Sequence, residues 1–143
     1  MTSLPITYKG AVYPWHCDHM GHMNVMWYTG KMDEATWNFF ADLGISPAFL
    51  KDNNRGMAAL EIKTNYLAEL VAGDVVSVHT KLREVLKGKL IKFTHEMVKG
   101  DGEVAAIAEI TGIHMDTAAR KACLFPEVIL QRIETMVEEH ATA

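Results

Sequence analysis

A long apolar helix followed by alternating strands constrains the fold of this chain more than any other feature. Apolar residues recur with helical spacing from Val25 to Leu43, and Trp27, Trp37 and Phe40 widen that stripe beyond one face. A helix that is apolar on several sides must be covered on several sides. The sequence therefore predicts a helix that the rest of the chain wraps.

Strands predicted before and after this helix supply the covering. They are expected at residues 7–13, 58–66, 76–82, 91–97 and 104–115. In the second of them, alternation predicts that Ala58, Leu60, Ile62, Thr64 and Tyr66 share one face. Pro126 is predicted at the first position of a final helix. The class is α+β, with a five-stranded, largely antiparallel sheet wrapped round a long central helix, plus a C-terminal helix, in one domain over residues 1–143.

Charge and composition exclude several classes of protein. The formal net charge of −4 argues against a nucleic-acid binder, which usually carries a basic surplus. No stretch approaches the roughly 20 apolar residues needed to span a bilayer, so no membrane association is expected. The N-terminus lacks the features of a signal peptide, and Cys17 and Cys123 are interpreted as reduced thiols, which together indicate a cytoplasmic protein.

The segment just before the long helix holds the most informative motif. Residues 15–23 are predicted to form a loop, and Asn24 is predicted to cap the helix. The segment resembles the D-x-x-G-H-x-N-x-x-x-Y pattern of hotdog-fold thioesterases of the 4-hydroxybenzoyl-CoA thioesterase-like superfamily. The pattern falls on Asp18, Gly21, His22, Asn24 and Tyr28. A second resemblance is the stretch from Tyr66 to Gly73-Asp74, similar to a strand and turn of that family.

The resemblance implies hydrolysis of an acyl-CoA by a homodimer or homotetramer, with CoA as part of the substrate and no separate cofactor or metal. Asp18 would act as general base on water or as nucleophile on the thioester carbonyl. The backbone N–H near Val25, at the positive end of the helix, would stabilise the oxyanion. His22 would orient the carbonyl or the water, and Asn24 would serve as cap and site residue.

Other residues are predicted to bind substrate. Gly21 permits close approach of the loop backbone to a ligand or a positive φ angle. Aromatic residues, Trp27 and Tyr28 among them, suit an acyl pocket, and Trp15, Trp27 and Trp37 together suit even a quaternary ammonium group. Asp33 is expected in the middle of the helix, where it would make a polar contact or act as an active-site acid. The candidates for the CoA phosphates surround one hairpin: Arg83, Lys87, Lys89 and Lys92.

Several alternatives remain open at this stage. Asp18 would also fit as an ordinary Asx-turn residue without a catalytic role. The basic residues of the hairpin would also fit as a solvated edge of the sheet. His16, His19 and His22 share a regular spacing but match no standard zinc motif. A hydratase on the same fold, using His22 with Asp33 or Glu34, and a non-catalytic acyl-CoA binding module are the rival functions.

Overall fold

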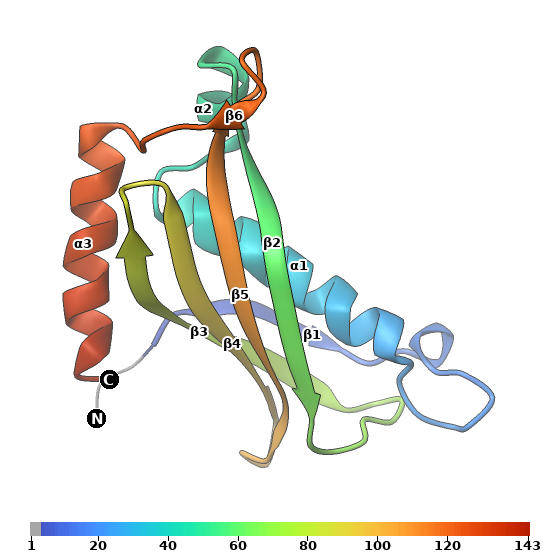
Figure 1. Ribbon diagram of the computed structural model, residues 1–143. Coiled ribbons are helices and arrows are strands. Elements are labelled where there is room, and N and C mark those ends of the chain that lie inside the picture. Colours follow the sequence, from blue (N-terminus) through green and yellow to red (C-terminus); the bar gives the residue numbers. More distant parts are fainter. Residues whose placement is uncertain (1–3) are drawn as a thin grey trace.

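The computed structural model describes residues 4–143 (Figure 1). Its strands are β1 (Ile6–Ala11), β2 (Arg55–Tyr66), β3 (Val75–Leu86), β4 (Leu90–Lys99), β5 (Val104–Asp116) and β6 (Lys121–Ala122). Its helices are η1 (a 3₁₀ turn, Pro14–His16), α1 (Val25–Asp42), α2 (Pro47–Asp52) and α3 (Glu127–Ala141). No helix among these residues combines the length and apolar character that crossing a bilayer requires.

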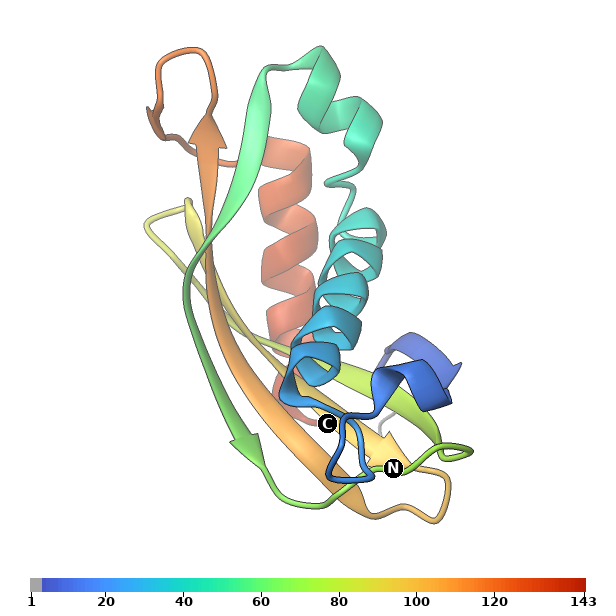
Figure 2. The ribbon, with the colours of Figure 1, turned by 90° about the vertical axis from the view of Figure 1, so that its right-hand side faces the viewer.

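The sheet has the order β1-β3-β4-β5-β2, and every pairing in it is antiparallel. The short strand β6 adds to β5. Seen from the side, the long strands curve round α1 (Figure 2). The predicted hotdog arrangement, a sheet wrapped round one long helix with a further helix at the C-terminus, is therefore confirmed.

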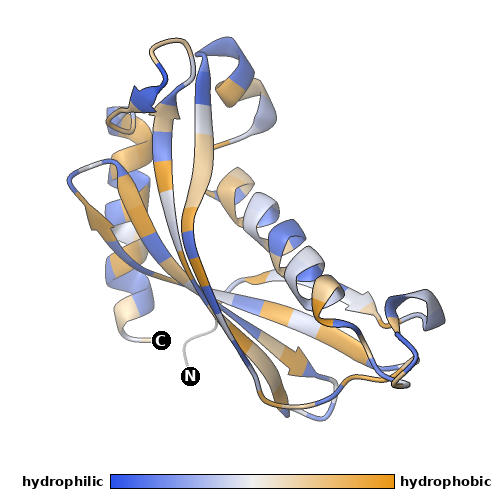
Figure 3. Cartoon of the chain, turned by 45° about the vertical axis from the view of Figure 1, so that its right-hand side comes forward, coloured by the Kyte–Doolittle hydropathy of each residue, from blue (hydrophilic) through white to orange (hydrophobic). Residues whose placement is uncertain are grey.

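Helix α1 is the centre of the hydrophobic core. Tyr28, Met32, Ala35, Phe39 and Phe40 of the predicted stripe are buried along it, whereas Val25 and Trp37 are 56% and 44% exposed. Ring contacts join the helix to the sheet, because the Phe93 ring of β4 lies between those of Phe39 and Phe40, at centroid distances of 5.4 and 5.8 Å. The strands that surround the helix carry alternating hydrophobic and hydrophilic residues (Figure 3).

Strand β2 differs from its prediction because it contains a bulge. The register shifts between Ala59 and Glu61, so that Leu60 has no partner on β5. Ala59 pairs with Gly112, and Ile62 pairs with Ile110. The extra residue reverses the alternation, so the prediction that Ala58 shares a face with Ile62 and Tyr66 is wrong.

Two helix starts also differ from the sequence interpretation. Ser46-Pro47 begins α2, a short helix that the sequence analysis did not predict. The Ser46 hydroxyl accepts a hydrogen bond from the Phe49 N–H at 3.1 Å, with Pro47 in the first turn. In α3, Pro126 is the N-cap rather than the first helical residue. In the predicted loop, residues 14–16 form the 3₁₀ turn η1.

The two edges of the sheet differ in whether another element covers them. Strand β1 pairs with only the first part of β3, up to His79. Beyond it, α3 covers the edge, and the Leu82 N–H donates to Nδ1 of buried His140 at 2.9 Å. Strand β2 is the other edge, and Leu60 and Ile62 on it are 57% and 51% exposed. The sheet therefore has one protected edge and one open, apolar edge.

A chain of buried hydroxyl and imidazole groups crosses the core. The Thr36 hydroxyl donates to the Met32 carbonyl at 3.1 Å, so it accepts from Nε2–H of His95 at 2.8 Å. Nδ1 of His95 and the Thr80 hydroxyl lie 2.8 Å apart, and the Thr80 and Thr7 hydroxyls lie 2.7 Å apart. Thr7 also donates to the Val78 carbonyl at 3.3 Å. The chain joins α1, β4, β3 and β1, and burial disfavours the charged form of His95 within it.

We predict that His95 makes the fold acid-labile. Burial lowers the pKa of His95 to about 4, whereas an unfolded histidine titrates near 6.5. Stability present above pH 6.5 is therefore lost as pH falls toward 4, by roughly 3 kcal/mol from this group. Urea unfolding between pH 7.5 and 4.5 measures the loss. In His95→Gln the starting stability falls but the pH dependence becomes shallower, and an unchanged pH dependence contradicts the assignment.

Candidate active site

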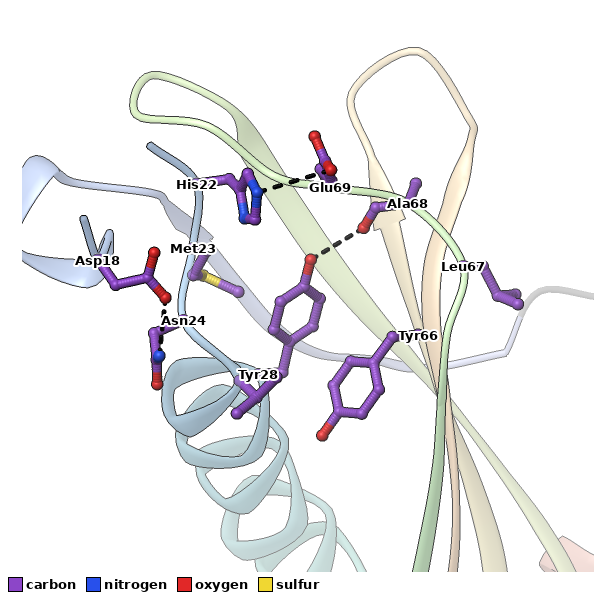
Figure 4. Close-up of a pocket in the computed structure, with 10 residues that line it drawn as sticks. Asp18, His22, Met23, Asn24, Tyr28, Tyr66, Leu67, Ala68 and Glu69 are labelled. Atoms are coloured by element: carbon purple, nitrogen blue, oxygen red, sulfur yellow. Dashed lines mark hydrogen bonds and ion pairs between the residues drawn. The ribbon is translucent and has the colours of Figure 1, made fainter. Parts of the chain in front are cut away.

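A cavity of about 370 Å³ lies where the loop before α1 meets the connection between β2 and β3 (Figure 4). It is lined by ten residues: Asp18, His22, Met23, Asn24, Val25, Tyr28, Tyr66, Leu67, Ala68 and Glu69. Two segments that are distant in sequence thus form its walls. The cavity includes four of the five positions of the motif, and Gly21 lies in the same loop.

The loop is closed by its own backbone hydrogen bonds. The Asp18 N–H donates to the His22 carbonyl at 3.2 Å, and the Gly21 N–H donates to the Asp18 carbonyl at 3.0 Å. Gly21 has φ of 89°, a conformation that glycine adopts without strain, as expected from the motif. The Met23 N–H donates to the Leu70 carbonyl at 2.7 Å and fixes the loop against the opposite wall.

Asp18 is held as a carboxylate by two hydrogen bonds. Its Oδ2 accepts from the Asn24 side-chain amide, and its Oδ1 accepts from the Met20 N–H, both at 2.8 Å. These bonds, the Asn24 bond first, lower the pKa of Asp18, and the charges of His19 and His22 lower it further. The Asx-turn geometry is therefore present, and it orients a carboxylate that stays ionised at neutral pH.

Asn24 also caps α1, as predicted. Its Oδ1 accepts from the Met26 N–H at 2.9 Å, and its backbone carbonyl accepts from the Trp27 N–H at 2.9 Å. Within residues 4–143, the Val25 N–H has no hydrogen-bond partner. This open donor lies at the positive end of an 18-residue helix and lines the same cavity as Asp18.

The opposite wall contributes an acid that the sequence analysis did not select. Nε2 of His22 lies 3.6 Å from Oε1 of Glu69. The Tyr28 hydroxyl donates to the Ala68 carbonyl at 2.9 Å, and the Tyr66 ring meets the Tyr28 ring edge-on at 5.2 Å. Glu69 falls inside the stretch from Tyr66 to Gly73-Asp74 that resembles the family, but it lies between the positions of that pattern, so the sequence carried no signal for it.

The basic residues predicted to bind substrate lie away from this cavity. Arg83 and Lys92 line a depression on the outer face of the sheet, where Nε of Arg83 donates to Thr94 at 3.0 Å. Lys87 and Lys89 flank the turn between β3 and β4, at the end of the sheet remote from the loop before α1 (Figures 1 and 2). None of these four side chains lines the Asp18 cavity.

The aromatic and acidic residues predicted to bind substrate also lie in different places. Trp27 packs on the His16 ring at 4.6 Å, and Trp15 is 5.8 Å from the same ring. Trp37 instead packs on Phe40, so the three tryptophans do not form one pocket. Asp33 lies in a second cavity, between α1 and β2, with Met26, Thr36 and Ile62 among its lining residues.

The regularly spaced histidines do not converge. Nδ1 of His16 accepts from the Tyr13 N–H at 2.9 Å, and its ring is buried, whereas His22 points to Glu69. Among residues 4–143, no three His, Cys, Asp or Glu side chains are grouped so that they would hold a metal ion. His22 and Asp33 line different cavities, and Glu34, the other acid of the hydratase alternative, is not among the residues that line the cavity of His22.

Comparisons with known proteins agree with this architecture. The family model of the thioesterase-like superfamily matches residues 12–133. Betainyl-CoA thioesterase of Pseudomonas aeruginosa is 25% identical over 140 residues, which cover 98% of this chain and 88% of that protein. L-carnitine dehydrogenase/betainyl-CoA thioesterase of Agrobacterium fabrum is 26% identical over 119 residues, 82% of this chain and 24% of that longer protein.

Solved structures share the fold. A Staphylococcus aureus protein in complex with CoA superposes with a TM-score of 0.90 at 22% identity, over 98% of this chain and 89% of that one. At this identity the likeness concerns the fold alone. It extends to almost the whole length of both chains.

We predict that two substitutions of Asn24 separate its roles. Asn24→Ala removes both the cap and the donor to Asp18, and the lost cap costs about 1 kcal/mol of stability. Asn24→Asp keeps a capping oxygen but replaces the donor by a like charge. The pKa of Asp18 rises in both variants, and rises more in Asn24→Asp. Urea unfolding and carbon NMR titration of aspartate side chains measure these effects. An unchanged pKa of Asp18 in both variants contradicts the assignment.

Proposed function

This chain belongs to the thioesterase-like superfamily, and from that premise we propose that it hydrolyses acyl-CoA thioesters at the Asp18 cavity. Membership makes the protein a thioester hydrolase. One observation supports the position of the site above all. An ionised carboxylate, Asp18, and an open helix N-terminal donor, the Val25 N–H, line the same small cavity.

The first task of the site is to stabilise the oxyanion that forms when the thioester carbonyl is attacked. We assign this role to the Val25 N–H, assisted by the positive end of the α1 dipole. The donor is pre-organised, because the bonds of Asn24 to Met26 and Trp27 fix the first turn around it. A fixed donor of this kind contributes about 10²- to 10³-fold in kcat in other hydrolases.

Asp18 has two possible roles in the proposed reaction. As a general base it takes a proton from water, the hydroxide attacks the carbonyl carbon, and the C–S bond breaks to release CoA thiolate. As a nucleophile its carboxylate attacks that carbon, thiolate leaves, and water hydrolyses the resulting anhydride. The lowered pKa weakens Asp18 as a base but keeps it ionised for attack. Neither route requires a metal or a further cofactor.

The two relatives suggest a short acyl group bearing a quaternary ammonium for this chain as well. Both of those proteins carry betainyl-CoA thioesterase in their names. The cavity volume, about 370 Å³, suits an acyl group of that size together with the thioester. Its lining supports the same class, because Tyr28 and Tyr66 supply aromatic surface and Glu69 supplies negative charge.

We propose a homodimer formed through strand β2. It is the open edge of the sheet and presents the exposed apolar side chains Leu60 and Ile62. Pairing of two such edges would satisfy their free backbone groups and cover the cavity between α1 and β2. A second copy, or a tetramer of two such dimers, could also bring the basic residues Arg83, Lys87 and Lys89 towards the phosphates of CoA. We place the reaction in the cytoplasm, where CoA esters are available.

We predict that Asp18→Asn lowers kcat by about 10²-fold or more with little change in KM, because the substitution keeps size and removes the charge. Thiol release from short, long, aromatic and betainyl acyl-CoAs measures the effect. Asp116→Asn is the matched control, since Asp116, at the end of β5, is also a carboxylate bound to backbone N–H groups. Wild-type protein that binds acyl-CoA without turnover would support the binding-module alternative instead.

We predict that Ile62→Lys shifts the protein to monomer. A charge on the open edge opposes apolar association of two β2 strands. Light scattering after size-exclusion chromatography measures the mass, and Ile6→Lys on the opposite edge strand is the control, since Ile6 is 59% exposed. A wild-type protein that elutes as a monomer, or a dimer unaffected by Ile62→Lys, contradicts the proposed interface.

A further inference from the structure

The charge of the Asp18 cavity is distinctive. Among its ten lining residues are two carboxylates, Asp18 and Glu69, but no lysine or arginine. The Asp18 carboxylate is occupied by the Asn24 amide and the Met20 N–H. Among residues 4–143, the one ion-pair partner of the Glu69 carboxylate is His22, at 3.6 Å, and the Glu69 side chain is 74% exposed. Glu69 is thus the carboxylate of this cavity that is available to a ligand.

This distribution indicates which part of the substrate the Glu69 side receives. The nucleotide end of CoA carries several phosphate charges, which a wall containing carboxylates and no cation would repel. The acyl group therefore occupies the Glu69 side of the cavity, and the nucleotide lies outside it. This step depends on the proposed function, because that function places an acyl-CoA in the cavity.

Fixed aromatic surface accompanies Glu69. Tyr66 is 48% exposed, and the Tyr28 ring supports it edge-on with an angle of 89° between the ring planes. Tyr28 is itself held by its hydrogen bond to the Ala68 carbonyl. Tyr66 and Glu69 flank Ala68 on the wall opposite Asp18 (Figure 4). An aromatic ring and an available carboxylate that line one cavity are suited to an organic cation without N–H donors.

We infer that Glu69, together with the ring of Tyr66, is a specificity determinant that selects acyl groups bearing a quaternary ammonium next to the thioester. In such a group one methylene separates the cation from the carbonyl carbon. The cation and the reacting carbon must therefore fit into one small cavity, as Glu69 and Val25 do here.

The test compares two acyl groups of the same shape that differ in charge. Betainyl-CoA carries a trimethylammonium group, and 3,3-dimethylbutyryl-CoA carries a tert-butyl group at the same position. The ratio of their kcat/KM values is measured for wild type and for Glu69→Gln. The intrinsic reactivity of each thioester cancels when the ratios of two variants are compared. We expect Glu69→Gln to reduce the preference for the cation by about 5- to 10-fold.

Control variants distinguish recognition from a general effect of charge or folding. Glu134→Gln, on the exposed face of α3, makes the same change in net charge outside the cavity and should leave the ratio unchanged. Tyr66→Phe keeps the ring and should retain the preference, whereas Tyr66→Leu should reduce it. An unchanged ratio in Glu69→Gln, or an equal fall in Glu134→Gln, overturns the inference.

A binding measurement separates this inference from the proposed function. Ketone analogues of the two acyl-CoAs, with a methylene in place of the thioester sulfur, cannot be hydrolysed, and calorimetry gives their affinities. A cation preference that disappears in Glu69→Gln supports the inference even if neither ester is turned over, in which case the proposed function fails alone. Turnover of both esters with no such preference in binding or in kcat/KM overturns the inference alone.

Discussion

The enclosure of α1 by the curled sheet is the constraint on which the other features depend. Burial of its apolar side requires the strands to curve, and the Phe93 ring contacts those of Phe39 and Phe40 in tilted and edge-on geometry between helix and sheet. The polar chain from Thr36 through His95 helps to fix how the helix is seated, because hydrogen bonds join it to the strands. The N-terminus of the helix, where Val25 is 56% exposed, remains open to solvent.

Asn24 links that helix terminus to the carboxylate beside it. One oxygen of its side-chain amide stabilises the start of α1, and the nitrogen of the same amide holds Asp18 in its ionised form. Folding and the preparation of the site therefore share one side chain. The arrangement keeps the Asp18 charge beside the Val25 donor even without substrate, so the geometry does not have to be assembled during binding.

The sequence predicted the elements best where a single period extends over many residues. The stripe of α1 and the Asn24 cap were identified correctly because both depend on local spacing. Leu60 could not be recognised as a bulge, since one extra residue in a strand leaves the apolar composition unchanged. The motif predicted Asp18 and Asn24 as site residues, and both line one cavity with Val25. It could not reveal that Glu69 faces His22, because that contact depends on how the chain folds back after β2.

The walls of the cavity come from two segments of the chain. In the proposed reaction one segment carries the chemistry and the other selects the acyl group. In that reaction the loop and helix terminus supply Asp18 and the oxyanion donor, whereas the end of β2 supplies Tyr66 and the β2–β3 connection supplies Glu69. A backbone hydrogen bond from the Met23 N–H to the Leu70 carbonyl joins the two walls. The distance between the walls therefore does not depend on the Glu69 side chain. Substitutions on the second wall can therefore change which acyl group is accepted while the hydrogen bonds of Asp18 remain intact. The same fold can then serve different acyl groups without rebuilding its catalytic end.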